Sequence, residues 1–275
     1  MTFTQQAFHA AISAGRHAIV PFICGGYPRP GDTERAILAL TAGATPVCPV
    51  IEVGFPFSDP IADGPTIAAA MHEALNPPAS GGILPATPES VMNEVARARP
   101  HTRAAIIAMV SYSILARIGE SRFVASAARA GFNGFIVPDL PLEEAQPLRS
   151  LAAAAECSLS FLIAPTTPPV RAAAIARAST GFIYLLARTG VTGAAQAPSG
   201  FSDLAARVAD LRHAASLPIA CGFGVSTPAD VDAVLQHADA AIVGTALVRE
   251  MGAAAARGES PSDAAARFVA GLSRV

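Results

Sequence analysis

The amino-acid sequence predicts an α/β protein built as a single (β/α)₈ barrel, with one domain over residues 1–275 and an extra helix at its N-terminus. Short apolar runs rich in Val, Ile and Phe alternate with longer Ala-rich segments whose apolar residues recur at helical period. Eight such pairs fit into about 250 residues, the usual size of a closed barrel of parallel strands covered by helices. Neither a linker nor a shift in composition marks a second domain.

The expected strands are uncharged apolar runs, except for one glutamate in the second. In chain order they cover residues 18–23, 50–53, 104–109, 134–137, 159–163, 182–186, 218–221 and 240–243. An open doubly wound sheet is the structural alternative. It is disfavoured because Cys24-Gly25-Gly26-Tyr27-Pro28 follows the first strand, where the dinucleotide-binding version requires Gly-x-Gly-x-x-Gly.

The expected helices lie between these strands, and three of them have recognisable start signals. Asp32 precedes residues 33–40, Pro65 precedes 66–75, and Thr87 with Pro88 precedes 90–98. Later helices are expected to begin at residues 120, 142, 169, 201, 227 and 245. The Pro- and Gly-rich segment 76–87 is expected to be a surface loop.

The N-terminal 16 residues are expected to form an amphipathic helix around Phe3, Phe8 and Ile12, not a signal peptide. The longest uncharged runs are broken by Pro and Gly, so we expect a soluble, cytoplasmic protein that does not enter a membrane. Four widely spaced cysteines are expected to be reduced core residues. The six histidines are scattered, which predicts no metal site, and no redox cofactor is indicated.

Composition excludes several classes of function. The chain has 52% hydrophobic and 15% charged residues, and 19 basic against 21 acidic residues give a net charge of −2 without a basic stripe. Nucleic acid is therefore not an expected partner. All of the 19 are Arg, because the sequence contains no Lys. A Schiff-base aldolase, an enzyme that anchors its own pyridoxal phosphate and a Walker-type phosphate loop each need a Lys and are excluded.

A carboxylate inside an apolar strand is the first candidate for chemistry. Glu52 lies in the second expected strand, and in a barrel of this type the active site is built at the carboxyl ends of the strands. A buried glutamate must be paired, protonated or turned toward a ligand, and a raised pKa suits a general acid or base. The alternative is an internal ion pair with an Arg, but no Arg lies in a neighbouring strand.

Two further residues near the strand ends are candidate site residues because of their neighbours in the sequence. Asp63 stands before Gly64-Pro65, where a functional carboxylate and a plain turn or helix cap are equally good interpretations. Tyr184 lies in the sixth expected strand and either lines the barrel mouth or is a locally bonded core residue. The Gly-rich segment that follows, to Gly200, has the length and composition of a mobile lid or of a plain solvated loop.

Glycines after the last two expected strands indicate a phosphate site. Gly222 and Gly224 follow the seventh strand, and Gly244 with Thr245 follows the eighth. Each segment leads directly into a helix, whose N-terminal amides attract an anion without any Lys or Arg. Barrels bind phosphate at this place. A glycine that serves only the turn is the alternative at each site.

Taken together, these segments resemble the alpha chain of tryptophan synthase. The run EVGFPFSDPIADGPT, from Glu52 to Thr66, resembles that family's most distinctive motif. Further similarities cover residues 21–22, 26–28, 137–141, 184, 188–193, 222–224 and 243–245. The resemblance extends from about residue 3 to about residue 248.

The resemblance implies a (β/α)₈ lyase that splits indole-3-glycerol phosphate into indole and glyceraldehyde 3-phosphate by a retro-aldol reaction, with no cofactor in this chain. It implies that Glu52 is the general acid and base and that Asp63 holds the indole N–H. Substrate-binding positions carried over in the same way are Phe22, Tyr184, Thr192, Gly193, Gly224, Gly244 and Thr245. Thr192, in the loop from residue 188 to about residue 200, would contact Asp63 when the loop closes.

The resemblance also implies a partner, the pyridoxal-phosphate-containing beta chain, in an α2β2 complex. Pro56, Asp59 and Ser113 match positions at the contact with that chain. The family usually has Tyr at the position of Ser111 and Asn at that of Ser113, so docking of a beta chain is in question here. The resemblance also implies extra residues, relative to the usual family member, at 45–50 and 76–86.

Three other functions remain open from sequence. A stand-alone lyase without a partner would combine an intact Glu52 and Asp63 with an altered docking surface. A paralogue with weakened catalysis could serve as a binding or activating subunit. Another phosphate-binding barrel, such as a sugar-phosphate isomerase, is compatible with the fold alone.

Overall fold

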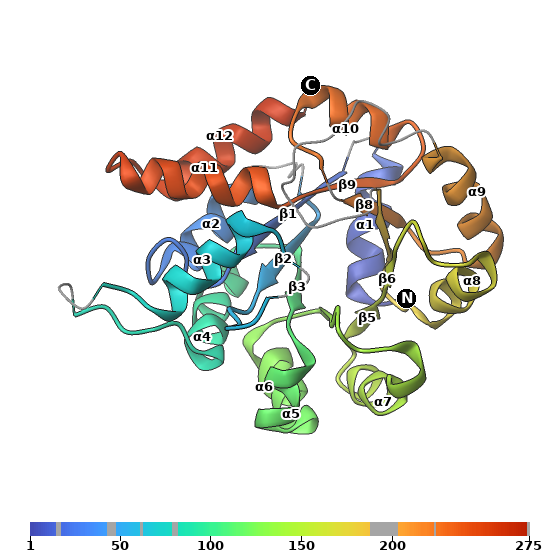
Figure 1. The fold of residues 1–275 in the computed structure, drawn as a ribbon, viewed down its shortest axis with the longest axis horizontal. Helices are drawn as coiled ribbons and strands as arrows, with labels where there is room; N and C mark the ends of the chain where they lie inside the picture. Colours follow the sequence, from blue (N-terminus) through green and yellow to red (C-terminus); the bar gives the residue numbers. More distant parts are fainter. Residues whose placement is uncertain are drawn as a thin grey trace.

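The computed structural model describes residues 1–14, 18–42, 48–60, 63–78, 82–187, 203–222 and 224–273, and it has helices arranged around a parallel sheet (Figure 1). The strands are β1 (Ala18–Cys24), β2 (Val50–Gly54), β3 (Ala105–Met109), β4 (Gly134–Ile136), β5 (Ser158–Ser160), β6 (Leu162–Ile163), β7 (Ile183–Leu186), β8 (Ile219–Gly222) and β9 (Ala240–Val243). They are ordered β5-β4-β3-β2-β1-β9-β8-β7-β6, and every pair is parallel. Since β5 and β6 are consecutive in the chain, the sheet closes on itself. The expected barrel is confirmed.

One expected strand is interrupted. The run 159–163 forms β5 and β6, with Phe161 between them. Side-chain hydroxyls replace ladder bonds at this point: Phe161 N donates to Ser179 Oγ (3.2 Å) and Phe182 N donates to Ser160 Oγ (3.1 Å). Regular pairing with β7 resumes at Leu162. The eight expected strands are therefore nine segments.

The helices that cover the barrel, including two short 3₁₀ turns, follow the chain order. They are α2 (Asp32–Leu40), α3 (Pro65–Leu75), α4 (Pro88–Ala98), η2 (Arg99–His101), α5 (Tyr112–Ile118), α6 (Glu120–Ala130), η3 (Leu142–Glu144), α7 (Gln146–Ala154), α8 (Pro169–Ala178), α9 (Leu204–Ala214), α10 (Pro228–Leu235), α11 (Thr245–Ala256) and α12 (Pro261–Leu272). Most begin within a residue or two of the expected position because local signals set their starts. Thr87 and Thr227, for example, form capping boxes with Ser90 and Asp230.

Three helical features differ from expectation. The helix expected from residue 142 begins at Gln146, because the 3₁₀ turn η3 comes first and Pro147 occupies the first helical turn. The helix expected from residue 201 begins at Leu204, and residue 201 itself lies outside the described residues. The helices α5 and α12 were not expected from the sequence pattern. The α12 helix packs against α2 and α11, which explains its apolar face.

The expected N-terminal helix is present as α1 (Phe3–Ser13) and closes the amino-terminal end of the barrel. Phe8 is fully buried, with its ring centroid 5.3 Å from that of Phe182. Thr4 Oγ1 lies 2.9 Å from Ser158 Oγ inside the barrel. The expected apolar face was wrong at Phe3 and Ile12, which are 41% and 37% exposed, because only one side of this short helix enters the barrel.

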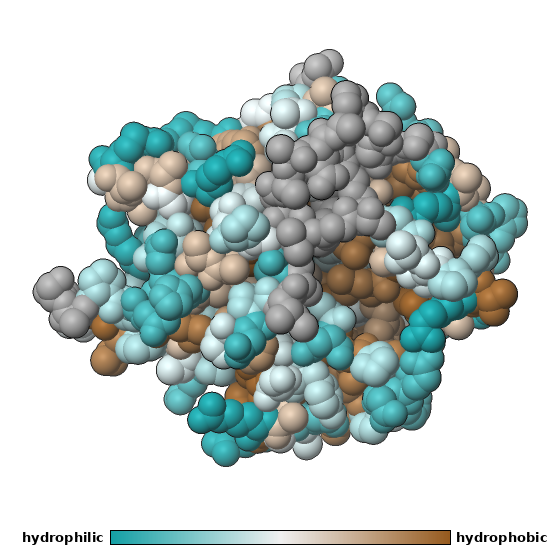
Figure 2. All heavy atoms as spheres, viewed as in Figure 1, coloured by the Kyte–Doolittle hydropathy of each residue, from teal (hydrophilic) through white to brown (hydrophobic). Residues whose placement is uncertain are grey.

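The apolar core has two main parts. The larger one lies between the outer faces of the strands and the surrounding helices, and the smaller one fills the barrel interior around Val20, Ile107, Phe182 and Ile242. Figure 2 shows hydrophobic side chains in a hollow near the middle of the visible face, with hydrophilic residues over much of the surrounding helices. All four cysteines are free and buried, as expected.

Candidate active site

The structure places Glu52 inside the barrel, without a compensating partner in the described part of the chain. Its neighbours in register are Phe22 of β1 and Ile107 of β3. The side chain is 0% exposed, and neither carboxylate oxygen has a hydrogen-bond partner among the described residues. The ion pair with an Arg, considered as the alternative, is therefore not seen in the described part of the chain.

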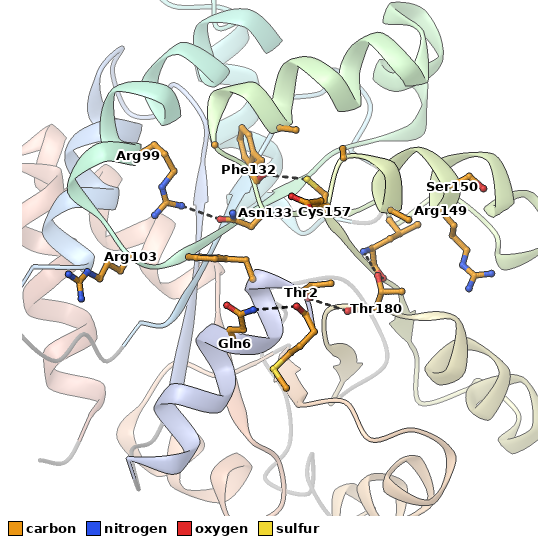
Figure 3. A pocket seen from close by; sticks show the side chains of 18 of the residues that line it. Thr2, Gln6, Arg99, Arg103, Phe132, Asn133, Arg149, Ser150, Cys157 and Thr180 are labelled. Carbon is orange, nitrogen blue, oxygen red and sulfur yellow. Dashed lines mark hydrogen bonds between the residues drawn. The ribbon is translucent and has the colours of Figure 1, made fainter.

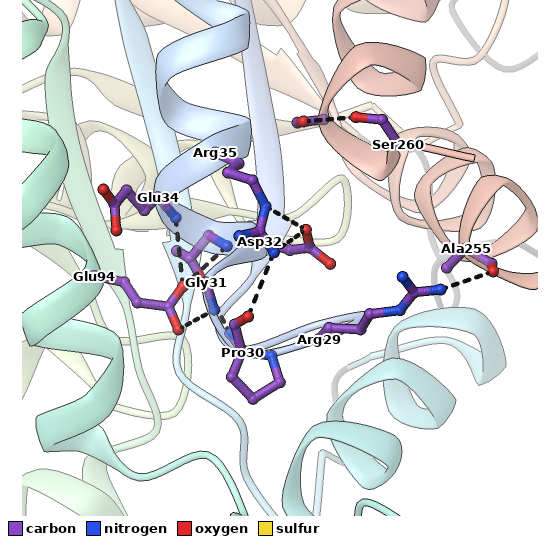
Figure 4. A network of polar contacts seen from close by, with 12 residues as sticks. Arg29, Pro30, Gly31, Asp32, Glu34, Arg35, Glu94, Ala255 and Ser260 are labelled. Carbon is purple, nitrogen blue, oxygen red and sulfur yellow. Dashed lines mark hydrogen bonds and ion pairs between the residues drawn. The ribbon is translucent and has the colours of Figure 1, made fainter. Parts of the chain in front are cut away.

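A second buried glutamate shows how unusual this situation is. Glu94 of α4 is 5% exposed, but its carboxylate accepts hydrogen bonds from the backbone N–H groups of Gly31 (2.8 Å), Thr33 (3.0 Å) and Glu34 (3.4 Å) (Figure 4). It thus caps the first turn of α2 from a neighbouring helix, where a negative charge is favourable. Glu94 is a structural carboxylate, whereas Glu52 has no comparable structural role.

Burial without a partner changes the acidity of Glu52. Because the charged form is the one that loses hydration, burial raises the pKa of the Glu52 carboxyl well above its ordinary value of 4.5. A carboxyl whose protonated form is favoured in this way is suited to act as a general acid, and its conjugate base as a general base. Strongly shifted carboxyls in cavities are typical of active sites.

Asp63 is a second carboxyl whose pKa is raised. It is partly buried at the end of the loop after β2, and burial raises its pKa to about 6. The interpretation as a helix cap does not apply, because the N-cap residue of α3 is Gly64. The charges of Glu52 and Asp63 both raise the pKa of the buried Tyr184 hydroxyl, in addition to the larger effect of its burial. These three side chains therefore share one site.

Glycines leave room for the aromatic side chains of the site. A Cβ atom at Gly222 would lie 3.2 Å from the Tyr184 hydroxyl oxygen, and a Cβ at Gly54 would lie 2.5 Å from Phe22 Cζ. Both glycines stand in strands next to the residues that they accommodate. The two rings therefore occupy space that any larger residue at positions 54 or 222 would take.

The two expected phosphate segments differ in how their helices begin. Asp230 of α10 accepts hydrogen bonds from the backbone N–H groups of Ser226 (3.0 Å) and Thr227 (2.9 Å), so this N-terminus already holds an anion of its own. The helix α11 has Gly244 at its N-cap, no side-chain cap and no acidic residue in its first turn. Its amides are thus better suited to an external anion.

The remaining expected substrate residues are only partly covered by the structure. Gly224 has a φ of 85°, a conformation that favours glycine, and Gly244 and Thr245 are partly buried. Thr192 and Gly193, together with the whole segment 188–202 that includes the expected lid, lie outside the described residues. The longer segments 45–50 and 76–86 are described only at residues 48–50, 76–78 and 82–86.

The residues expected at a partner surface lie in different environments. Pro56 is buried, while Asp59 and Ser113 are exposed. At the start of α5, Ser111 Oγ donates to Asp139 Oδ2 (2.7 Å) and Tyr112 N donates to Asp139 Oδ1 (2.8 Å). Asp139 therefore holds this corner of the barrel rim.

Sequence reasoning did not single out Glu94 or Asp139. Each holds the backbone at the start of a helix that is not its own, α2 for Glu94 and α5 for Asp139. Glu94 could not be distinguished from a solvated helix residue, because its partners are about sixty positions away in the chain. Asp139 was noted only as part of a matching segment.

A crevice lies at the opposite end of the barrel. It has a volume of about 1130 Å³ and is lined by the start of α1 and by residues that directly precede strands, among them Arg103, Asn133 and Thr180 (Figure 3). Arg99 on its wall donates to Asn133 Oδ1 (3.1 Å). None of the expected site residues lines it, so this crevice is separate from the expected active site.

Two features are absent from the described residues. No group of three or more His, Cys, Asp or Glu side chains there could hold a metal ion. No helix in this part of the chain is long and apolar enough to cross a bilayer.

Comparison with known proteins gives a consistent result. The family model described as tryptophan synthase alpha chain matches residues 8–273. The tryptophan synthase alpha chain of Chloroflexus aurantiacus is 42% identical over 249 residues, which are 90% of this chain and 89% of that one, and that of Halorhodospira halophila is 40% identical over 261 residues, 95% and 92% of the two chains.

Solved structures agree with these sequence matches. The tryptophan synthase alpha subunit of Legionella pneumophila superposes with a TM-score of 0.84 at 27% identity, covering 99% of this chain and 97% of that one. A chain of Mycobacterium tuberculosis tryptophan synthase gives a TM-score of 0.81 at 30% identity, covering 98% and 97%.

Proposed function

Because this chain belongs to the tryptophan synthase alpha chain family, a carbon–carbon lyase family of tryptophan biosynthesis that cleaves indole-3-glycerol phosphate, we propose how its own residues divide the work of that cleavage. The observation that carries the proposal is the buried Glu52 carboxyl without a hydrogen-bond partner among the described residues. It shares the site with Asp63 and Tyr184.

Glu52 is the general acid and base. As an acid it protonates C3 of the indole ring, and as a base it accepts the proton of the glycerol hydroxyl. The carbon–carbon bond between ring and side chain then breaks, and its electron pair returns to the ring and neutralises the charge on the indole nitrogen. The electron pair of the O–H bond becomes part of the aldehyde carbonyl. Indole and glyceraldehyde 3-phosphate leave, and the raised pKa of Glu52 supports proton transfer in both directions.

Asp63 acts on the indole nitrogen. Protonation at C3 places positive charge on this N–H, and an ionised carboxylate that accepts its hydrogen bond stabilises that charge. With a pKa of about 6, Asp63 is mostly ionised at neutral pH. The two carboxyls thus have separate tasks, because burial favours the protonated form of Glu52 while Asp63 is mostly ionised.

The other substrate-binding residues define the shape of the indole pocket and hold the phosphate. Phe22 and Tyr184 border the indole and the side chain, in positions that depend on Gly54 and Gly222. The amides of Gly224, Gly244 and Thr245, at the α10 and α11 turns, bind the phosphate, together with Gly193. Thr192 contacts Asp63 when its loop closes.

The family implies a beta chain as partner. We place the contact on the rim that carries Pro56, Asp59 and Ser113, in an α2β2 complex in the cytoplasm, with pyridoxal phosphate in the beta chain only. The bonds from Ser111 and Tyr112 to Asp139 favour a second candidate, a stand-alone lyase, because they complete this corner of the rim without a partner.

The test is indole formation from indole-3-glycerol phosphate by the purified chain, with and without a beta chain of the same source. Activity that rises with the beta chain and is lost in Glu52→Gln supports the catalytic alpha subunit. Full activity without a partner indicates the stand-alone lyase. No indole in either condition contradicts the proposal and favours a binding or activating subunit.

A further inference from the structure

At its carboxyl end, β7 lacks a strand partner on one side, and this affects how the position of Tyr184 is held. On one side, Ala187 N donates to Gly222 O of β8 (2.8 Å). On the other side, β6 pairs with β7 only at Tyr184 and Leu185, so its ladder ends before Leu186. The Leu186 carbonyl therefore needs a donor from outside the sheet.

Arg207 of α9 supplies that donor. Its Nη1 donates to the Leu186 oxygen at 3.0 Å, and the side chain is partly buried. Its Nη2 is buried without a hydrogen-bond partner among the described residues. A guanidinium is costly to place there, and a stable core does not require one, because an apolar residue would fill the same space.

We propose that Arg207 is a positioning residue of the lyase, which fixes the carboxyl ends of β7 and β8 and thereby the place of Tyr184 beside the substrate. Tyr184 precedes Leu186 by two residues and points into the barrel with it. Leu186 is in register with Gly222, where a Cβ would lie only 3.2 Å from the Tyr184 hydroxyl. A small movement of either strand end therefore moves this hydroxyl. The inference rests on the proposed function for its kinetic consequence only.

The same helix offers a matched control. Arg212 also donates to a backbone carbonyl, that of His237 (3.2 Å), and to Asp239 Oδ1 (3.0 Å). Those residues directly precede β9, so Arg212 acts at the amino-terminal end of the barrel. Both arginines are donors from α9 to the sheet region, but only Arg207 reaches the end where the site lies.

The experiment compares Arg207→Met, Arg207→Lys and Arg212→Met in the full chain. The chain has three tyrosines, so 3-fluorotyrosine labelling is expected to give three ¹⁹F resonances, and Tyr184→Phe identifies that of Tyr184. We expect Arg207→Met to move the Tyr184 resonance alone and to lower kcat about tenfold with a much smaller change in KM, since misplacement affects the reacting geometry most. Arg207→Lys, which keeps one donor, restores part of both.

Arg212→Met should change neither the Tyr184 resonance nor kcat. The proposal is overturned if Arg207→Met behaves as Arg212→Met does, or if all three resonances move together, which would indicate a general loss of structure. If Arg207→Met does not fold, Arg207→Lys decides: an unchanged Tyr184 resonance and unchanged kcat overturn the proposal. Should the parent chain release no indole, the proposed function fails, while the ¹⁹F comparison still tests the positioning.

Discussion

At the amino-terminal end of the barrel, Thr4, Ser158 and Asn133 are hydrogen-bonded within the protein, and Phe8 fills the space beside them. Toward the carboxyl end, Glu52 is just as buried, but neither of its oxygens has a partner among the described residues. The same barrel thus satisfies its polar groups where α1 closes it and leaves a costly one unsatisfied where substrate would bind. Local conflict of this kind is expected at functional sites, and stability is recovered elsewhere.

The largest expected effect is a loss of activity on substitution of Glu52, toward the carboxyl end of the barrel. Glu52→Gln should lower the rate of indole release by roughly 10³-fold, because the amide cannot transfer protons. Stability should not fall. The raised pKa means that the parent is stabilised below the unfolded pKa and loses this contribution as pH rises toward and through the folded pKa. The stability of the variant relative to the parent should therefore be greater when measured at about pH 8 than at about pH 5. Kinetics and thermal unfolding at both pH values measure this.

Glu94→Gln is the matched control for that prediction. Its carboxylate accepts three backbone hydrogen bonds, so the variant should lose about 1–3 kcal/mol of stability and retain its kcat. If Glu94→Gln lost activity as Glu52→Gln does, the distinction between a structural and a reactive buried glutamate would be wrong.

A substitution at the amino-terminal end of the barrel, which α1 closes, should change stability but not activity. Phe8→Ala removes a fully buried ring and should cost about 3–5 kcal/mol, because the interior around it cannot collapse completely. Denaturant unfolding gives this value, and kcat measured well below the unfolding transition should stay within about twofold of the parent. A large fall in kcat under those conditions would break the comparison between the two ends.

The titration of Asp63 should determine how kcat/KM changes with pH on the acidic side. With a pKa of about 6, it is protonated below that pH and no longer accepts the indole N–H well, so kcat/KM should rise through about pH 6 and then level off. Asp63→Asn should lower kcat/KM about 10–100-fold and remove this step. A step that persists near the same pH in the variant assigns it to another group.

The smallest expected effect is at a strained turn before β5. Glu156 is the C′ residue after α7 and has a φ of 56°, with Cys157 N donating to Ala152 O (2.8 Å) in the Schellman pattern. Glu156→Gly should stabilise the protein by about 0.5 kcal/mol, since relief of this conformation slightly exceeds the entropy that glycine adds to the unfolded chain. Glu156→Ala, measured alongside by thermal unfolding, should show no such gain.

The sequence could predict a site residue where that residue differs in polarity from its immediate neighbours in the chain. Glu52 interrupts an apolar strand, and that contrast needs no partner to be seen. Asp63 was ambiguous, because a turn before a helix uses the same residue types. The structure places Gly64 at the cap, but Asp63 N donates to Pro60 O (3.1 Å), so the turn interpretation stays open beside the functional one. The roles of the phosphate and indole residues came from family resemblance, and residues 192 and 193 lie outside the described part of the chain.

The sequence by itself determined the barrel class and most helix starts, because alternating periodicity and caps such as Thr87 and Thr227 act within a few residues. Only the tertiary structure decided that residues 159–163 form two segments and that Phe8 but not Phe3 enters the core. It also decided that Glu94 is hydrogen-bonded, while Glu52 has no partner among the residues that the structure describes. These outcomes depend on groups that approach from distant parts of the chain, such as the Ser179 hydroxyl and the amides of α2. Hydrogen bonding and close packing between such groups are set by the closed barrel, and no local pattern encodes them.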